Sequence, residues 1–241
     1  MINPFSLVYP DLRGRSQLPE IMDDPGSDEV LLHRTLRQFS LINCLLSRNR
    51  GLSRTYLFSH MRSRKLTHCS VLDVGAGGGD YGRWLRKEGQ RWGIDVHVTL
   101  LDSDPRVISY LHQTMPDDPG ITVIQGSILD LGSMSGAFDY VFANHFLHHL
   151  PDEKIPDVVR CIDKIANQGF LINDLVRSHT SLFFFTLFGL IFLPRSFALA
   201  DGRQSIRRAF RREEISQLLG PLPEIRIGTA KPGRLFLYRF K

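Results

Sequence analysis

A glycine-rich corner constrains the fold of this chain more than any other feature. Residues 70–74 (Ser-Val-Leu-Asp-Val) are short, apolar and β-branched, as expected for a parallel strand that is covered on both faces. Residues 81–86 return to helical spacing. Between the two segments lie Gly75, Gly77 and Gly79. Because glycine accepts positive φ and lets a ligand approach the backbone, this corner predicts a nucleoside site at a helix N-terminus.

The acidity of this corner separates two kinds of ligand. Asp73 and Asp80 flank glycines spaced D-x-G-x-G-x-G, whereas a dinucleotide site typically has G-x-G-x-x-G and places a pyrophosphate on the turn. A carboxylate there repels phosphate but attracts a ligand with a cationic end, such as an amino-acid ammonium beside a sulfonium. A nucleotide-binding βαβ unit places a ribose-binding acid about 20 residues beyond its last glycine. At that distance in this chain, the apolar residues 98–101 are followed by Asp102.

These two segments resemble motif I and the following acidic motif of class I S-adenosylmethionine-dependent methyltransferases. The likeness continues with residues 121–127 as a third strand and 138–144 as a fourth, and covers roughly residues 66–177. It implies an α/β, Rossmann-like fold, in which a seven-stranded, mostly parallel sheet has an antiparallel last strand and helices on both faces. It also implies S-adenosylmethionine as the cofactor. The implied cofactor-binding residues are Asp73, Gly75, Ala76, Gly77, Gly79, Asp102, Ser103, Ser127, Ile128 and Asn144.

One cofactor contact departs from the family pattern. The family usually has an acidic residue after the third strand to accept from the adenine amino group, but this chain has Ser127, with Ile128 next to it. A hydroxyl is still an acceptor, so we expect Ser127 to take this role. Asp139, which precedes the fourth strand's apolar run, is interpreted as a turn residue rather than a ligand.

Length and composition favour a single enzyme domain. The 241 residues are 42% apolar, which is enough to bury a substantial core. We expect residues 1–65 to form an arm and helices over the substrate side. Residues 66–241 then form the cofactor-binding domain, with a Phe-rich insertion at 180–210. The three cysteines are widely separated and odd in number, and residues 1–5 show no export signal, so we expect a cytoplasmic protein.

Two helices are expected before the glycine corner. Residues 11–27 are rich in Pro, Gly and Asp and predict an irregular arm. Residues 27–29 offer an N-cap for an amphipathic helix that runs to about Ser47, and Ser53 is expected to cap a second helix that ends near Arg62. Such helices often cover the substrate side in small-molecule methyltransferases, and plain packing on the sheet is the alternative.

Three histidines, His145, His148 and His149, follow the fourth strand. Ligands bind at the carboxyl ends of strands in an open parallel sheet. An imidazole that titrates near ~6.5 can take the proton of a phenol, so each is a candidate base, with His148 or His149 preferred. Helix packing and capping compete with this interpretation, because the family commonly carries a similar L-H-H segment. No metal site is predicted, since no Cys or carboxylate lies at ligand spacing within the segment.

The predicted fifth strand, residues 169–172, delivers three more polar candidates to the same edge of the sheet. These are Asn173, Asp174 and Arg177, which are expected to hold a substrate hydroxyl or carboxylate. The structural alternative is that Asp174 caps the next helix and Arg177 pairs with it.

Residues 182–193 contain five phenylalanines and no charge. The stretch is too short to span a bilayer, which takes ~20 apolar residues, and Pro194 ends it. A buried helix, a lid over an apolar pocket and a shallow membrane contact remain open. Phe184 and Phe188 are candidate substrate contacts, because aromatic walls suit a flat or alkyl-chain acceptor.

Five arginines follow within residues 203–212. Nucleic acid is a poor partner, because the net charge is only +5 and the arginines lack interleaved aromatic side chains. Residues 182–212 are instead a candidate contact for an anionic membrane surface or an acidic carrier protein. A carboxylated substrate is a further option, a solvated helix is the alternative, and the sequence indicates no oligomeric state.

A closing hairpin is expected at residues 225–227 and 234–238. Residues 19–25, 173–175 and 201–210 further resemble small methyltransferases of bacterial aromatic polyketide and quinone-type pathways. This resemblance implies methyl transfer to an oxygen, or less favourably a carbon, of a hydrophobic phenolic, quinol or polyketide-like small molecule. One alternative is an NAD-dependent oxidoreductase, which the glycine spacing disfavours. The other is a noncatalytic scaffold that docks a partner or a membrane.

Overall fold

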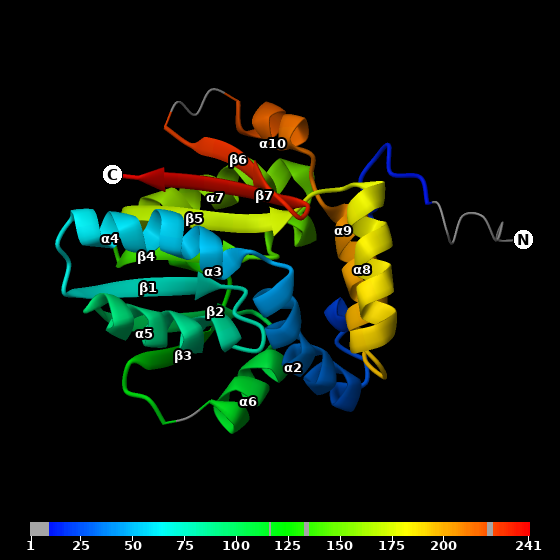
Figure 1. Cartoon of the computed structure of the whole chain (residues 1–241), viewed down its shortest axis with the longest axis horizontal. Helices are drawn as coiled ribbons and strands as arrows, with labels where there is room; N and C mark the ends of the chain where they lie inside the picture. The colour runs from blue at the N-terminus through cyan, green and yellow to red at the C-terminus, as the bar shows by residue number, and fades with distance from the viewer. Residues whose placement is uncertain (1–9, 116, 133–134, 221–223) are drawn as a thin grey trace, which may run out of the picture.

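The computed structural model describes residues 10–115, 117–132, 135–220 and 224–241. A seven-stranded sheet forms the centre of the molecule (Figure 1). Its strands are β1 (His68–Val74), β2 (Asp95–Asp102), β3 (Ile121–Gln125), β4 (Phe138–Asn144), β5 (Ala166–Leu175), β6 (Arg226–Ala230) and β7 (Arg234–Phe240).

The strand order is β3-β2-β1-β4-β5-β7-β6. Strands β1 to β5 are parallel, β7 runs antiparallel to β5, and β6 pairs antiparallel with β7. The expected Rossmann-like sheet with an antiparallel last strand is therefore confirmed. Because β1 pairs with β2 on one side and with β4 on the other, the order reverses at β1, and this reversal opens a crevice at the carboxyl ends of the strands.

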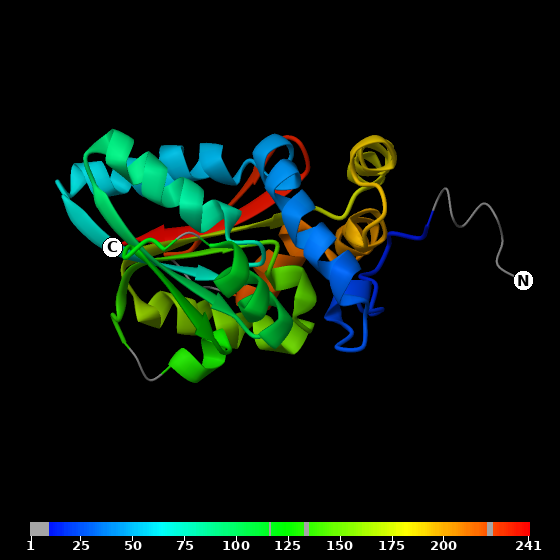
Figure 2. The same ribbon diagram turned by 90° about the horizontal axis from the view of Figure 1, so that it is seen from below.

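Two layers of helices cover the sheet (Figure 2). Alternate strand residues serve the two layers, so that Val71 packs in one cluster and Leu72 in the other. The first layer contains α2 (Glu29–Leu45), α3 (Asn49–Leu52), the π-helical η2 (Ser53–Phe58), α4 (Ser59–Ser63), α5 (Asp80–Trp92) and α6 (Pro105–Thr114). The second contains the short η3 (Ile128–Leu131) and η4 (Leu147–His149), followed by α7 (Ile155–Ile165) and α10 (Arg212–Leu219). A further short turn, η5 (Asp152–Lys154), precedes α7.

Two helices stand beyond the carboxyl ends of the strands, at the right of Figure 1. They are α8 (His179–Phe192) and α9 (Ala198–Arg208), which pack with Ile42 of α2 and Leu175 of β5. The N-terminal arm, which includes η1 (Ile21–Asp23), lies beside α9, because Asp201 accepts hydrogen bonds from the backbone N–H groups of Ile21 and Met22.

Several predicted boundaries shift. The second N-terminal helical segment begins at Asn49, and Ser53 lies inside it, where its hydroxyl pairs with the Tyr81 hydroxyl at 2.7 Å instead of capping a helix. The Phe-rich helix begins earlier than residue 182, because Ser178 caps it by accepting from the backbone N–H of Ser181.

Candidate active site

A cavity of about 490 Å³ opens at the carboxyl ends of the parallel strands. Its floor comes from the ends of β1, β2 and β4, and its other walls come from the arm, α2, α8, α9 and the start of β7. The volume is in the range that small-molecule sites occupy. The structure thus brings together segments from nearly the whole described chain.

The glycine corner forms one end of this cavity. Gly75 and Gly77 have φ of +68° and +50° and line the cavity with Ala76, as expected. Gly79 also has positive φ, but it lies under the turn, where a Cβ would come within 2.8 Å of Leu111. Gly79 is outside the described cavity lining, so its glycine is required by packing and backbone conformation rather than by a ligand.

Asp73 faces the cavity with an uncompensated carboxylate. The side chain is 3% exposed, and its Oδ2 atom has no hydrogen-bond partner among the described residues. Burial raises the pKa of Asp73 well above its usual value, and the nearby charges of Asp80 and Asp102 add to the effect. A cationic ligand would relieve this destabilisation. The residues therefore fit a sulfonium or ammonium group and oppose a pyrophosphate.

Asp102 ends β2 on the opposite side of the glycine turn. Its Oδ2 accepts from the Gly77 N–H and its Oδ1 from the Asp104 N–H, both at 3.1 Å. Burial raises the pKa of Asp102, although these backbone hydrogen bonds oppose the shift. Each oxygen keeps further acceptor capacity, and Ser103 lines the cavity beside it. This arrangement fits the ribose-binding role expected for Asp102.

The expected adenine end is built by Ser127 and Ile128, which both line the cavity. The Ser127 hydroxyl caps η3 by accepting from the Leu129 N–H at 3.3 Å. Asn144, at the end of β4, also lines the cavity, where its amide donates to Asn43 of α2 at 3.0 Å. The predicted cofactor positions other than Gly79 therefore surround one cavity.

His148 is held as an imidazolium away from the cavity. It is 1% exposed, its Nδ1 lies 2.6 Å from Asp174 Oδ1, and its Nε2 lies 3.5 Å from Glu20 Oε1. Burial lowers the pKa of His148, but the charges of Asp174 and Glu20 outweigh it and raise the pKa to about 9. A group protonated at neutral pH is a poor base, and His148 is absent from the described cavity lining. The preference for His148 as base is thus corrected.

His149 and His145 do line the cavity. His149 Nδ1 lies 3.3 Å from Asp23 Oδ2, which leaves Nε2 directed to the side of Glu20, 3.9 Å from Oε1. Burial lowers the pKa of His145 well below its usual value, and the Arg234 guanidinium beside it adds to the effect. His145 is therefore neutral, but its Nε2 is already bonded to Arg234 at 3.0 Å. Nε2 of His149 forms no hydrogen bond within the described residues, whereas Nε2 of His145 does.

Glu20 and Asp23 are site residues that the sequence interpretation missed. One ligand atom each of Glu20, His148 and His149 lies within 4.8 Å of the others, a spacing that a metal ion could bridge. Sequence spacing within the histidine segment does not reveal this group, because Glu20 belongs to the N-terminal arm. The Nδ1 atoms of both histidines lie at hydrogen-bond distance from carboxylates, whereas Nε2 of His148, 3.5 Å from Glu20 Oε1, has no hydrogen-bond partner among the described residues.

Arginines hold the backbone of this group. Arg15 donates to the carbonyls of His148 and Leu150, and Arg208 donates to those of His148 and His149 at 3.1 and 2.9 Å. In the same predicted cationic stretch, Arg211 donates to the Leu12 carbonyl. These arginines fasten the arm and the histidine segment, which differs from the expected open surface for an anionic partner.

The predicted substrate residues do not line the cavity in the described part of the chain. Asn173 donates to Asn144 and to the Ser47 carbonyl, and Asp174 is bonded to His148. Arg177 is 2% exposed and pairs with Glu214 rather than with Asp174. All three side chains are buried, Asn173 and Asp174 at the end of β5 and Arg177 just beyond it.

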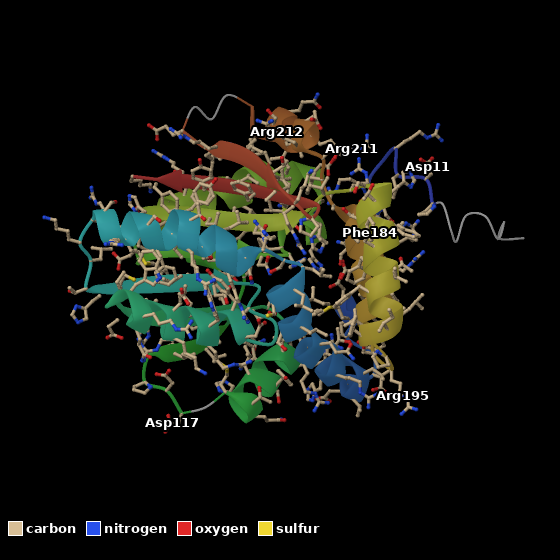
Figure 3. All side chains as sticks on the ribbon, viewed as in Figure 1. Asp11, Asp117, Phe184, Arg195, Arg211 and Arg212 are labelled. Carbon is tan, nitrogen blue, oxygen red and sulfur yellow. The ribbon has the colours of Figure 1, made fainter. Side chains whose placement is uncertain are left out.

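The Phe-rich helix presents a different ring than expected. Phe184 is 62% exposed on the outer side of α8 (Figure 3), and Phe188 packs against the α8–α9 cluster outside the lining. Phe185 lines the cavity instead, and its ring occupies the space that a Cβ on Gly202 would need, at 2.1 Å. The aromatic wall exists, but a neighbouring phenylalanine supplies it.

Comparisons with known proteins agree with this site. Residues 71–169 match the family model described as a methyltransferase domain. The human N-acetylserotonin methyltransferase in complex with SAM has a TM-score of 0.59 at 12% identity, over 89% of this chain. This chain spans 56% of the human chain. A search of curated protein sequences finds no match.

Two smaller proteins match over most of both chains. The plantazolicin methyltransferase BpumL in complex with SAH has a TM-score of 0.59 at 17% identity, over 92% of this chain and 98% of its own. A putative S-adenosylmethionine-dependent methyltransferase of Methanococcus maripaludis has a TM-score of 0.59 at 14% identity, over 95% and 97%. Residues 71–169 thus match a methyltransferase-domain model, and the chain shares the fold of these methyltransferase structures.

Proposed function

We propose that this protein is an S-adenosylmethionine-dependent methyltransferase that methylates a hydroxyl oxygen of a hydrophobic phenolic, quinol or polyketide-like acceptor. The proposal depends on the part of the cavity that is lined by Ile42, His149 and Phe185, which we call the acceptor chamber. There His149, oriented by Asp23 and next to Glu20, shares one cavity with the apolar side chains of Ile42 and Phe185. Apolar walls beside a proton acceptor suit an acceptor that is itself apolar apart from a hydroxyl.

The chain's own residues contribute mainly by position. Asp102 and the glycine turn would hold the nucleoside and Asp73 the cationic end, and the bound cofactor would supply a methyl group that its sulfonium has already activated. Transfer of this methyl group to the acceptor oxygen would release S-adenosylhomocysteine, and Nε2 of His149 would take the hydroxyl proton. Oxygen is favoured over carbon because a hydroxyl presents an acidic proton that an imidazole can take.

Two measurements test the proposal. Calorimetric titration with S-adenosylhomocysteine and with NADH separates the cofactors, and binding of NADH in place of S-adenosylhomocysteine would support the oxidoreductase. A mass-spectrometric screen of phenols, quinols and polyketide acids with S-adenosylmethionine should then find a product heavier by one CH₂ unit and methylated on oxygen. A carbon-methylated product, or no product from any acceptor class, would contradict the proposed reaction.

A further inference from the structure

The outer face of α8 exposes an unusual row of large apolar side chains. Residues 183, 184, 187, 190 and 191 repeat at the spacing of one helix face. The exposed fractions are 64% for Phe183, 62% for Phe184, 50% for Leu187, 67% for Leu190, 63% for Ile191 and 50% for Phe192. Single exposed apolar side chains are ordinary on soluble proteins, but a ridge of five on one helix face indicates an interaction surface.

We propose that this ridge docks on an anionic lipid bilayer, with α8 lying in the plane of the interface. No helix in the described ranges is long and apolar enough to cross a membrane. A 14-residue helix is shorter than the ~20 residues that a span requires. It matches a helix that buries one apolar face at the depth of the headgroups.

Charge around the ridge favours lipid phosphate. No acidic residue occurs between Asp174 and Asp201, so α8 carries no carboxylate. Arg195 is exposed just beyond the end of α8 (Figure 3). Arg203 of α9 reaches the Thr186 hydroxyl on α8 itself. Cationic side chains beside an inserted apolar face are the arrangement that anionic headgroups attract.

A bilayer fits this surface better than an acidic carrier protein. Carrier recognition relies on accessible positive charge, whereas Arg208 and Arg211 bind backbone carbonyls within the molecule. What α8 presents is apolar, and it projects from the edge of the molecule (Figure 2). A projecting ridge can enter the acyl boundary.

The same helix connects this surface with the cavity. Phe185, on the inner face of α8, lines the cavity, while Phe184 beside it faces outward. Docking would therefore hold the acceptor chamber one helix thickness from the lipid. A hydrophobic acceptor dissolved in the bilayer would have a short path to the site, although docking itself does not depend on the proposed reaction.

Vesicle co-sedimentation tests the proposal with the full chain. Vesicles of phosphatidylcholine with phosphatidylglycerol should pull down the protein, and vesicles of phosphatidylcholine alone should bind less. The triple variant Phe184→Glu, Leu187→Glu, Ile191→Glu should lower the partition coefficient by about tenfold or more. A matched control, Val30→Glu with Leu45→Glu, changes two apolar residues of α2 that are 65% and 55% exposed, and should bind like the wild type.

The affinity for S-adenosylhomocysteine serves as the check on folding, and all variants should keep it. Wild-type protein that stays in the supernatant with anionic vesicles would overturn docking, as would a triple variant that sediments normally. Sedimentation velocity tests whether a second copy of this chain covers the ridge instead. A wild-type protein that is dimeric and does not bind vesicles, together with a monomeric triple variant, would assign the ridge to a dimer interface. These outcomes leave cofactor binding and methylation of a water-soluble phenol unaffected.

Discussion

The Nδ1 atom of His148 lies 2.6 Å from Oδ1 of Asp174, and both side chains are buried. The other carboxylate oxygen of Asp174 accepts from the His148 backbone N–H at 3.0 Å. One carboxylate at the end of β5 thus fixes both the ring and the backbone of the segment after β4. The next residue, His149, reaches the cavity from this fixed position.

This pair predicts a pH dependence of stability. Because the folded pKa of His148 is raised from 6.5 to about 9, its stabilisation is complete below pH 6.5 and is lost as the pH rises through 9. The shift corresponds to about 3 kcal/mol of unfolding free energy. Urea unfolding across this range should show the loss in the wild type and a flatter dependence in Asp174→Asn. Asp157→Asn, a surface control, should follow the wild type, and equal slopes in all three proteins would refute the assignment.

Asp102 is predicted to carry much of the nucleoside affinity. Asp102→Asn keeps the shape but removes a charged acceptor, so the Kd for S-adenosylhomocysteine should rise between about tenfold and a hundredfold. Asp95→Asn is the matched control, since Asp95 lies at the exposed start of the same strand. If calorimetry finds equal affinities for the two variants, the ribose assignment is wrong.

His149 is predicted to accept the proton of the acceptor hydroxyl. His149→Gln should lower kcat by about a hundredfold or more and leave the affinity for S-adenosylhomocysteine unchanged. The loss should be smaller for an acceptor of lower pKa, because such a hydroxyl needs less help. His112→Gln, on the exposed side of α6, provides the control. A His149 variant with wild-type kcat on every acceptor would show that His149 is not the base and that catalysis depends on the positioning of the reactants alone.

Gly202 is predicted to set the size of the acceptor chamber. A Cβ there would lie 2.1 Å from the Phe185 ring, so Gly202→Leu should push the ring into the cavity. The acceptor KM should rise while the Kd for S-adenosylhomocysteine stays constant. Adding Phe185→Ala should restore acceptor binding, and Gly51→Leu, at a position with open space, should have no effect on KM. Failure of the second substitution to rescue would place the acceptor elsewhere.

Arg177 is predicted to stabilise the fold rather than bind substrate. Its guanidinium is buried and donates to Glu214 and to the carbonyls of Leu12 and Ala209. Arg177→Met leaves these acceptors unpaired and should cost about 3–5 kcal/mol of unfolding free energy. Urea denaturation measures this, and the folded variant should keep its acceptor KM. Normal stability with a raised KM would restore the substrate role.

The cofactor half of the site follows from sequence because its determinants are local. A glycine turn after a buried strand, and an acid at the end of the next strand, meet wherever two parallel strands pair. The positions of Asp73, Gly77 and Asp102 could therefore be predicted without knowledge of distant segments. The fold class followed from the same alternation of strands and helices.

The acceptor half resisted prediction for two physical reasons. Glu20 and Asp23 meet the histidines only through the packing of the arm on α9, which no spacing encodes. The phase of α8 was also ambiguous, because a helix that is apolar all round has no polar face to mark its outside. The prediction of Phe184 in place of Phe185 is wrong by one residue along α8, and the packing of α8 on α9, where the Phe185 ring lies against Gly202, determines which ring lines the cavity.

Glu20, in the first described turn of the arm, and Arg234, in the final hairpin, are walls of the same chamber. A growing polypeptide can therefore complete this chamber only after the hairpin has been synthesised and has paired with β5. Until then, the chamber is incomplete, and S-adenosylmethionine cannot stabilise the chain by binding to it. Because a ligand stabilises only the state that binds it, cellular cofactor would selectively protect fully assembled molecules from proteolysis and leave partly folded ones exposed.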